Sequence, residues 1–480
     1  MLSFFCYDTG HVTGARDEFK RRNRGTAGAR VARMSARRRA STLAVSLAVL
    51  MIASLAGCND QSAMKLAAPP NLYSKGDNYP AAAIPQPLRS VAPEVLYVTD
   101  RQPVVGADGG LSGYSQKRSD SVVLGVSRVR FGSASDWEAL VRRTHADAGD
   151  PISRLSVETM QEIVRLPATP LPFERRANRL SVLPEAQASY RAATRAMQLE
   201  IAARLRATGQ NSVLLYIHGV NNDFEDGVAT TANIWHYAGR RGMPVAFSWP
   251  ASDTGLLQYF RDVTSGDFSV FHVKEFLRAL AEIPELERID IIAHSRGSAV
   301  MTTALRELLI EARAAGRDPR RAMKTGILIM AAPDLDVGVA RQRLIAEHFA
   351  EAFEQIDIYA NQHDQVLNLS RIVRAAALLG QLTAADFEEN EIASLTRAGN
   401  VHFIKVARLQ GLGHAYFREN PAVLSDIALT LRSRAAPGTV FRPLVAETGN
   451  IWGLQPDYPA GPLPSVLDMG LPMVLSGIER

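Results

Sequence analysis

Short apolar runs alternate with longer amphipathic segments through the second half of the chain. The runs are VLLYI (213–217), VAF (245–247), IDII (289–292), ILIMA (327–331), IDIYA (356–360) and VHFIKV (401–406). Runs without polar alternation are typical of strands covered on both faces, and helical crossovers between such strands make their pairing parallel. The pattern therefore predicts an α/β fold: a doubly wound, mostly parallel sheet with helices on both faces.

The segments on either side of this pattern are less regular. Residues 94–99 and 121–131 are expected to form strands, and an Ala- and Arg-rich helical stretch with loops is expected over residues 134–210. Residues 437–480 are rich in Pro and Gly. We expect this tail either to wrap around the domain, with Trp452 and Tyr458 as anchors, or to be mobile.

The N-terminus has the plan of an export signal. Three arginines at 37–39 precede an apolar run at 43–55, which is shorter than the ~20 residues that span a bilayer. The run ends in LAGC (55–58), which resembles a bacterial lipobox. Cys58 would then be acylated and become the first residue of the mature protein. The alternative is a buried apolar helix with an incidental cysteine.

These features divide the chain into four predicted parts. Residues 1–57 would be a signal peptide with an N-terminal extension, whose true start is Met1 or Met34. Residues 58–93 would be a lipid-anchored, Pro-rich tether, 94–436 the folded domain and 437–480 the tail. We expect the protein to be exported and anchored to the inner or outer membrane of a bacterial envelope, facing the periplasm.

Charge and cysteine content exclude several classes of function. The formal net charge is +5, but residues 1–57 hold ten Lys/Arg against three Asp/Glu, so residues 58–480 have a net charge of −2. A nearly neutral domain without a basic stripe is not expected to bind nucleic acid. Removal of Cys6 and acylation of Cys58 would leave no thiol for a disulfide, a metal site or a nucleophile.

A serine stands where a buried strand is expected to turn into a helix. In IDIIAHSRGSA (289–299) the small residues Ala293 and Gly297 lie two positions before and after Ser295. Such spacing lets strand and helix approach closely around a strained turn, which is the arrangement of a nucleophile elbow. The alternative is a serine that only caps the helix. As a nucleophile, Ser295 would need a base within hydrogen-bond reach.

The base is expected in the loop after the last strand, where His414 follows Gly411 and Gly413. Asp364, after an earlier strand, is the expected acid that orients the imidazole. Asp334 and Asp336 are rival acids, and any of the three could instead cap a helix. Among the other histidines, His218, His294 and His402 are expected to pack or to shape loops, and His363 could lie in a pocket.

Backbone amides are expected to stabilise the oxyanion of an acyl transfer. One is the N–H of Arg296, after the serine, and the other comes from Gly219 or Val220 in the turn after VLLYI. Asn221 and Asn222 could hold this turn in place. No Gly-rich phosphate loop and no dense cluster of metal ligands occurs in the sequence, so we expect neither cofactor nor metal.

Four motifs together resemble the bacterial α/β-hydrolase family of unknown function. They are IHGVNN (217–222), FSWP (247–250), AHSRG (293–297) and GHAYF (413–417), and TDR (99–101) is similar to the start of that domain. The resemblance implies the α/β-hydrolase fold and a serine hydrolase of esterase or lipase type, by analogy of fold. It implies no particular substrate.

The expected function is that of a membrane-anchored serine hydrolase which cleaves an ester or thioester of a small-molecule or lipid-like acyl substrate. Peptidase or amidase action would use the same residues, and a catalytically silent envelope lipoprotein that binds a partner is the alternative. The insertion at 251–271 could cap an apolar acyl pocket or form an ordinary crossover helix.

Overall fold

The computed structural model describes residues 69–74, 79–132, 134–145, 155–252, 256–374, 376–407, 413–461 and 463. The predicted signal peptide and Cys58 lie outside these residues. No helix in the described part of the chain is both long and apolar enough to span a bilayer.

One large sheet is the centre of the domain, with the described strands in the order β12-β13-β11-β10-β9-β8-β6-β7-β1-β2-β3. Its strands are β1 (Glu94–Val105), β2 (Leu111–Phe131), β3 (Leu155–Arg165), β6 (Ser212–Ile217), β7 (Met243–Ser248), β8 (Arg288–His294), β9 (Thr325–Ala331), β10 (Gln355–Ala360), β11 (Val401–Val406), β12 (Val445–Thr448) and β13 (Ile451–Leu454). In this spatial order, every pair of neighbouring strands from β13 to β1 is parallel. The pairs β1-β2, β2-β3 and β12-β13 are antiparallel. The predicted doubly wound, mostly parallel fold is confirmed.

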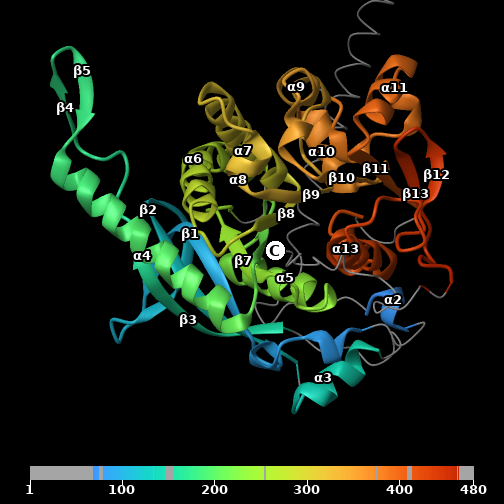
Figure 1. Ribbon diagram of the computed structural model, residues 1–480, viewed down its shortest axis with the longest axis horizontal. Coiled ribbons are helices and arrows are strands. Elements are labelled where there is room, and N and C mark those ends of the chain that lie inside the picture. Colours follow the sequence, from blue (N-terminus) through green and yellow to red (C-terminus); the bar gives the residue numbers. More distant parts are fainter. Residues whose placement is uncertain are drawn as a thin grey trace, which may run out of the picture. The chain divides into compact units, whose positions relative to one another are not determined.

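Helices cover both faces of this sheet (Figure 1). The described helices are α2 (Asn71–Ser74), α3 (Trp137–Thr144), α4 (Pro184–Thr208), α5 (Phe224–Tyr237), α6 (Leu256–Ala281), α7 (Arg296–Ala314), α8 (Pro319–Met323), α9 (Val337–Ala340), α10 (Gln365–Arg374), α11 (Glu389–Ala398), α12 (Tyr416–Glu419) and α13 (Pro421–Ser433). Helices α4, α6 and α7 pack on one face, whereas α2, α5 and α13 pack on the other.

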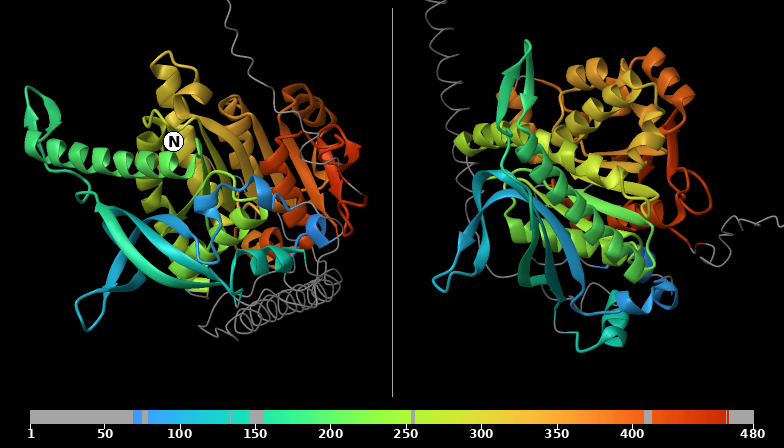
Figure 2. Two further views of the ribbon diagram at one scale, coloured as in Figure 1. Left: turned by 60° about the horizontal axis from the view of Figure 1, so that its bottom comes forward. Right: turned by 60° about the vertical axis from the view of Figure 1, so that its left-hand side comes forward.

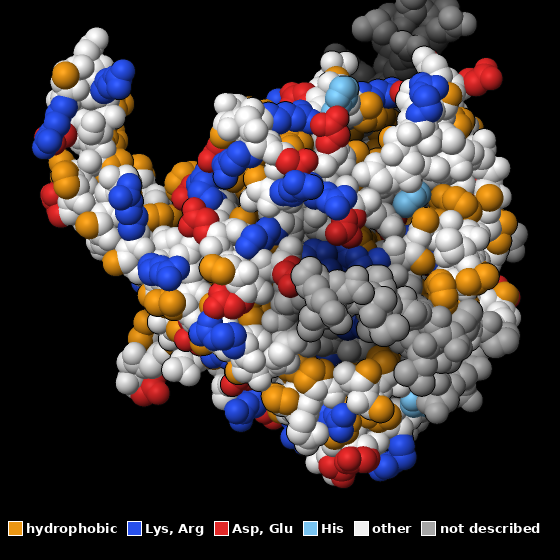
Figure 3. All heavy atoms as spheres, viewed as in Figure 1, with side chains coloured by type: hydrophobic (Ala, Val, Ile, Leu, Met, Phe, Trp, Pro, Cys, Tyr) orange, Lys and Arg blue, Asp and Glu red, His pale blue; other side chains and the backbone are white. Residues whose placement is uncertain are grey.

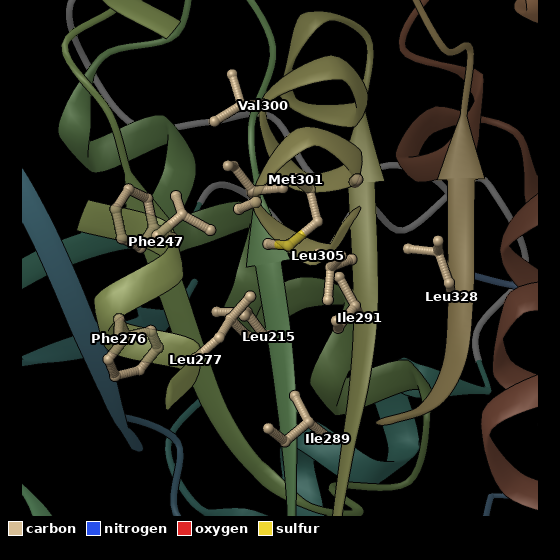
Figure 4. Packing of buried hydrophobic residues seen from close by; sticks show 14 of the residues in the cluster. Leu215, Phe247, Phe276, Leu277, Ile289, Ile291, Val300, Met301, Leu305 and Leu328 are labelled. Carbon is tan, nitrogen blue, oxygen red and sulfur yellow. The ribbon is translucent and has the colours of Figure 1, made fainter. Parts of the chain in front are cut away.

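Close packing explains why the central strands read as continuous apolar runs. Every residue of β6, β7, β9 and β10 is buried. Figure 4 shows Val300, Met301 and Leu305 of α7 packed over Leu215 and Ile291 of the sheet. Burial on both faces removes the need for alternating polar residues, and it fixes the strand ends at which the functional residues lie.

The helical prediction for residues 134–210 is wrong in part. Residues 155–165 form β3, which pairs antiparallel with β2, and a small hairpin follows, made of β4 (Phe173–Arg176) and β5 (Arg179–Val182). Strand β3 lies at the edge of the sheet and is mostly half-buried or exposed. Its apolar alternation is therefore weak, and the Ala and Arg content of the region dominated the prediction.

The predicted domain boundaries at 94 and 436 are too narrow. Leu72, Tyr73 and Ile84, within the expected tether, are buried in the same cluster as α5 and α13. At the other end, β12 and β13 extend the main sheet beside β11, and Tyr458 is buried. The folded domain therefore includes parts of both segments, and Tyr458 is an anchor as expected.

Candidate active site

Ser295 occupies the turn between β8 and α7. Its backbone has φ 51° and ψ −124°, a left-handed conformation that a residue with a side chain adopts only under constraint. The Ser295 N–H donates to the carbonyl of Ala331 at 2.9 Å, so the end of β9 holds the turn. The residue is 2% exposed. This is the geometry expected for a nucleophile elbow.

Two glycines allow the backbone to crowd around this serine. A Cβ on Gly297 would collide with the carbonyl oxygen of His218 and would lie 2.9 Å from that of Ile217. A Cβ on Gly219 would lie 2.7 Å from Ser295 Cβ and 3.2 Å from its Oγ. The first glycine lets α7 approach β6, and the second places the turn after β6 directly against the serine.

His414 and Asp364 form a pair at the same edge of the sheet. The distance between His414 Nδ1 and Asp364 Oδ2 is 2.7 Å, and the aspartate is fully buried. The other oxygen of Asp364 accepts the backbone N–H groups of Val366 and Leu367, each at 3.0 Å. The carboxylate is thus fixed by the start of α10, and His414 Nδ1 donates to it.

The loop that carries His414 is tied to the strands beside Ser295. The Asn361 side-chain amide donates to the Gly413 carbonyl at 2.9 Å. Tyr416 donates to the carbonyl of Tyr359 at 2.8 Å and accepts the Ala332 N–H at 3.0 Å. Ala332 directly follows the residue that holds the Ser295 turn. These bonds bring the His414 loop to the ends of β9 and β10.

His294 directly precedes Ser295 in the chain and packs against His414. Its ring centroid is 4.8 Å from that of His414, at an interplanar angle of 50°. Burial first, and then the neighbouring His414, lower the pKa of His294 well below its usual value, so the ring stays neutral and packs. Among the described residues, His414 Nε2 is buried and has no hydrogen-bond partner, and no hydrogen bond joins it to Ser295 Oγ.

The rival acids have other partners. Asp334 accepts the hydroxyl of Ser370 at 2.8 Å and that of Tyr259 at 3.0 Å, while Asp336 accepts the Val339 N–H and caps α9. His402, within β11, pairs with Asp357 at 2.8 Å. His363 is exposed. Of the candidate acids, Asp364 is the one that the structure brings to His414.

A buried arginine braces the turn expected to supply the second oxyanion donor. Arg101 donates to the Asn222 carbonyl at 2.7 Å, to Ser248 Oγ at 2.9 Å and to the Ala251 carbonyl at 3.3 Å. It is fully buried, and burial lowers its pKa to about 10, which leaves it cationic at neutral pH. The TDR resemblance pointed to this residue, but nothing in the sequence indicated its partners.

His218 lies next to this arginine and orients the same turn. Its Nε2 lies 3.4 Å from an Arg101 nitrogen and 3.2 Å from Ser248 Oγ, and its Nδ1 lies 2.8 Å from the Gly219 carbonyl. Burial, aided by Arg101, lowers the pKa of His218 to about 3, so the ring is neutral and Nδ1 carries the proton. The Gly219 carbonyl and the Val220 N–H belong to the same peptide group, and in a trans peptide these two groups point in opposite directions. Because the carbonyl points toward His218, the Val220 N–H points away from it.

The segment at 251–271 belongs largely to a crossover helix. Helix α6 connects β7 to β8, in agreement with the crossover alternative. Phe260 and Phe271 are 53% and 43% exposed, whereas Tyr259 reaches Asp334 beside the site. The apolar acyl pocket stays a prediction.

Within the described ranges, no three His, Cys, Asp or Glu side chains gather in a way that could hold a metal ion.

The chain is similar to one known protein family and, weakly, to two solved structures. No curated protein matches the chain. An esterase from Pyrobaculum calidifontis is 12% identical, with 48% of this chain and 78% of the other covered and a TM-score of 0.26. A serine hydrolase from Cycloclasticus zankles is also 12% identical, covering 46% and 86%, with a TM-score of 0.19. These likenesses are too weak to carry an argument. The family model described as alpha/beta hydrolase of unknown function (DUF900) matches residues 193–434, half of the chain, and the chain belongs to that family.

Proposed function

We propose that this α/β hydrolase is a serine hydrolase that cleaves an ester or thioester through an acyl-enzyme on Ser295. The observation that carries the proposal is the Asp364–His414 pair at the strand edge where Ser295 occupies a strained turn. A histidine whose Nδ1 donates to a buried carboxylate keeps the lone pair of Nε2 available as a base.

The proposed reaction has two halves. Ser295 Oγ bonds to the acyl carbon while its proton passes to His414 Nε2, and the carbonyl oxygen becomes an oxyanion. The Arg296 N–H at the start of α7 and the Val220 N–H are the proposed donors to that oxyanion. The oxyanion collapses and breaks the bond to the leaving group, which takes the proton from His414. Water then attacks the acyl-enzyme, gives a proton to His414 and releases the acid, and Ser295 regains its proton.

A fluorophosphonate probe tests this proposal on the purified protein. We expect covalent labelling that is lost in Ser295→Ala and retained in Ser298→Ala, the matched control. Ser298 lies in the first turn of α7 and donates to the Ala293 carbonyl at 3.1 Å, so it is a buried serine in the same elbow. Labelling that persists in Ser295→Ala would contradict the assignment of the nucleophile.

A catalytically silent partner-binding protein is the second candidate. One observation favours it: among the described residues, no hydrogen bond joins Ser295 Oγ to His414 Nε2. In hydrolases without substrate such bonds are often long, and they shorten when substrate binds. Absence of probe labelling in a folded wild-type protein would support this candidate against the hydrolase.

We also propose that the protein is exported and anchored through acylated Cys58. The support is the LAGC sequence after an apolar run and an arginine cluster. Cells fed a clickable fatty acid should label the wild-type chain, and Cys58→Ala should abolish the label and leave the precursor uncleaved. Equal labelling of both chains would contradict the anchor and would leave the hydrolase proposal untouched.

A further inference from the structure

A small β-hairpin precedes α4 and stands away from the main sheet. Its strands, β4 and β5, pair only with each other, and a tight turn with positive φ at Ala177 (44°) and Asn178 (64°) joins them. Figure 1 shows the hairpin beyond the N-terminal end of α4, and both views in Figure 2 show it projecting from the same end of that helix.

The register gives the hairpin two different faces. Phe173 pairs with Val182 and Arg175 with Leu180, so these four side chains share one face. Phe173, Leu180 and Val182 are 58%, 63% and 36% exposed. The opposite face carries the pairs Glu174–Ser181 and Arg176–Arg179. Three large apolar side chains therefore lie together on a ribbon that has no core of its own.

Residues 173–195, which form the hairpin and the start of α4 and are called the arm below, have a positive net charge, whereas the domain as a whole has a negative one. From residue 173 to residue 195 the chain has five Arg against two Glu, whereas residues 58–480 as a whole have a net charge of −2. The arginines are at positions 175, 176, 179, 191 and 195, and the glutamates at 174 and 185. Figure 3 shows basic and hydrophobic side chains together on the projecting arm.

We propose that this hairpin docks on an anionic lipid surface, with Phe173, Leu180 and Val182 entering the interface and Arg175, on the same face, binding a headgroup. An isolated two-stranded ribbon is marginally stable in water, so the exposed apolar face points to an external partner. Apolar side chains flanked by arginines have the composition of interfacial membrane segments.

Two other partners fit the hairpin less well. A second copy of the chain would bring two sets of like-charged arginines together. A protein partner of standard size contacts about 20–30 residues on each side, whereas the apolar face of the hairpin offers three large side chains. A membrane requires no matching groove and accepts such a small apolar face. The docking does not depend on the hydrolase reaction.

An environment-sensitive fluorophore on the hairpin tests the proposal in the full chain. Cys6→Ser and Cys58→Ser remove the native thiols, and Leu180→Cys receives an NBD label. Vesicles of phosphatidylcholine with phosphatidylglycerol should raise the NBD emission and shift it to shorter wavelength. Each arginine near an anionic surface changes partitioning about fivefold, so Arg175→Gln, which removes the arginine on the apolar face, should raise the lipid concentration required about fivefold.

The matched control carries the label at Ile372→Cys, another exposed apolar position, 74% exposed, in α10. Its emission should stay unchanged on the same vesicles. No response at position 180 would overturn the proposal and favour a protein partner. An equal response at both labels, or on vesicles of phosphatidylcholine alone, would also overturn it. Circular dichroism checks that each variant is folded.

Discussion

Two aspartate–histidine pairs connect the β10 and β11 regions, and they differ in what surrounds them. Within the sheet, Asp357 contacts His402 at 2.8 Å, and its other oxygen pairs with Arg442 at 2.8 Å. At the strand ends, Asp364 contacts His414 at 2.7 Å. The inner pair belongs to an ion-pair network with Arg442, whereas the outer histidine has a second nitrogen with no partner in the described structure.

The inner network links the last part of the domain to the sheet. Arg442 also donates to both oxygens of Asp426, at 2.9 and 2.8 Å, and Asp426 accepts the hydroxyls of Tyr359 and Tyr458. Burial opposes ionisation of Asp357, but Arg442 and His402 outweigh it and hold the pKa of that carboxyl below its usual value. An aspartate–histidine pair thus stabilises the fold inside the sheet, whereas at the edge of the sheet the same kind of pair is available for chemistry.

Replacement of each aspartate should separate the two roles most clearly. Asp364→Asn is expected to lower turnover about 10⁴-fold, because the imidazole loses the partner that fixes its tautomer, with little change in stability. Asp357→Asn should cost about 3–5 kcal/mol of unfolding free energy, because Arg442 loses a buried partner, and should preserve turnover per folded molecule. Esterase kinetics and urea unfolding of both variants measure this. Equal losses of turnover would break the distinction.

Two of the fully buried arginines, Arg101 and Arg442, extend the comparison. Arg101 bonds to carbonyl and hydroxyl oxygens around the proposed oxyanion turn, and Arg442 pairs with two aspartates. Arg101→Met should lower kcat about 10²-fold at little-changed KM, because a small displacement of the turn misplaces the Val220 N–H. Arg442→Met should instead destabilise the fold.

Kinetics on protein titrated with the fluorophosphonate probe give kcat per intact site for both arginine variants. Arg101→Lys keeps the charge but cannot reach the same set of acceptors, so it should recover little of the lost turnover. Full recovery by lysine would show that charge, and not the placement of the turn, is what matters at this position.

Acid should weaken the two regions in different pH windows. Burial lowers the pKa of His218 from about 6.5 in the unfolded chain to about 3 in the folded protein. Between pH 3 and pH 6.5 the unfolded chain therefore binds more protons than the folded protein. The neutral His218 makes its full contribution to the free energy of unfolding above pH 6.5. As the pH falls below 6.5, this contribution decreases by at most about 1.4 kcal/mol per pH unit. Asp357, whose folded pKa is depressed, contributes above about pH 4 and loses that contribution below it.

Urea unfolding from pH 7.5 to pH 4.5 measures the first window. His218→Asn retains an amide that can donate to the Gly219 carbonyl but does not titrate, so its stability should depend less on pH than that of the wild type. An unchanged slope would show that His218 is accessible to protons in the folded state.

The sequence predicted the parts of the molecule that depend on local pattern. The six apolar runs from residue 213 onward lie within strands β6 to β11, and the structure brings Asp364 to His414 and Gly219 to Ser295. These residues follow strands, and parallel strands deliver their C-terminal ends to one edge. The catalytic roles themselves stay predictions.

Features set by tertiary contact could not be predicted. The partners of Arg442 and Arg101 lie far from them along the chain, and no local spacing encodes those contacts. Strands β3 and β12 lie at the two edges of the sheet, where half-buried and exposed residues weaken the apolar pattern. Prediction failed where neighbours, and not periodicity, determine the conformation.

The position of Arg442 and Tyr458 in the chain has a consequence for synthesis on the ribosome. Asp357 and Asp426 are fully buried in the domain, yet the arginine and the tyrosine that pair with them follow both aspartates in the chain and are translated after them. A nascent chain that stops short of these residues cannot enclose the two carboxylates without leaving them unpaired. The domain should therefore become resistant to protease only after Tyr458 has left the exit tunnel.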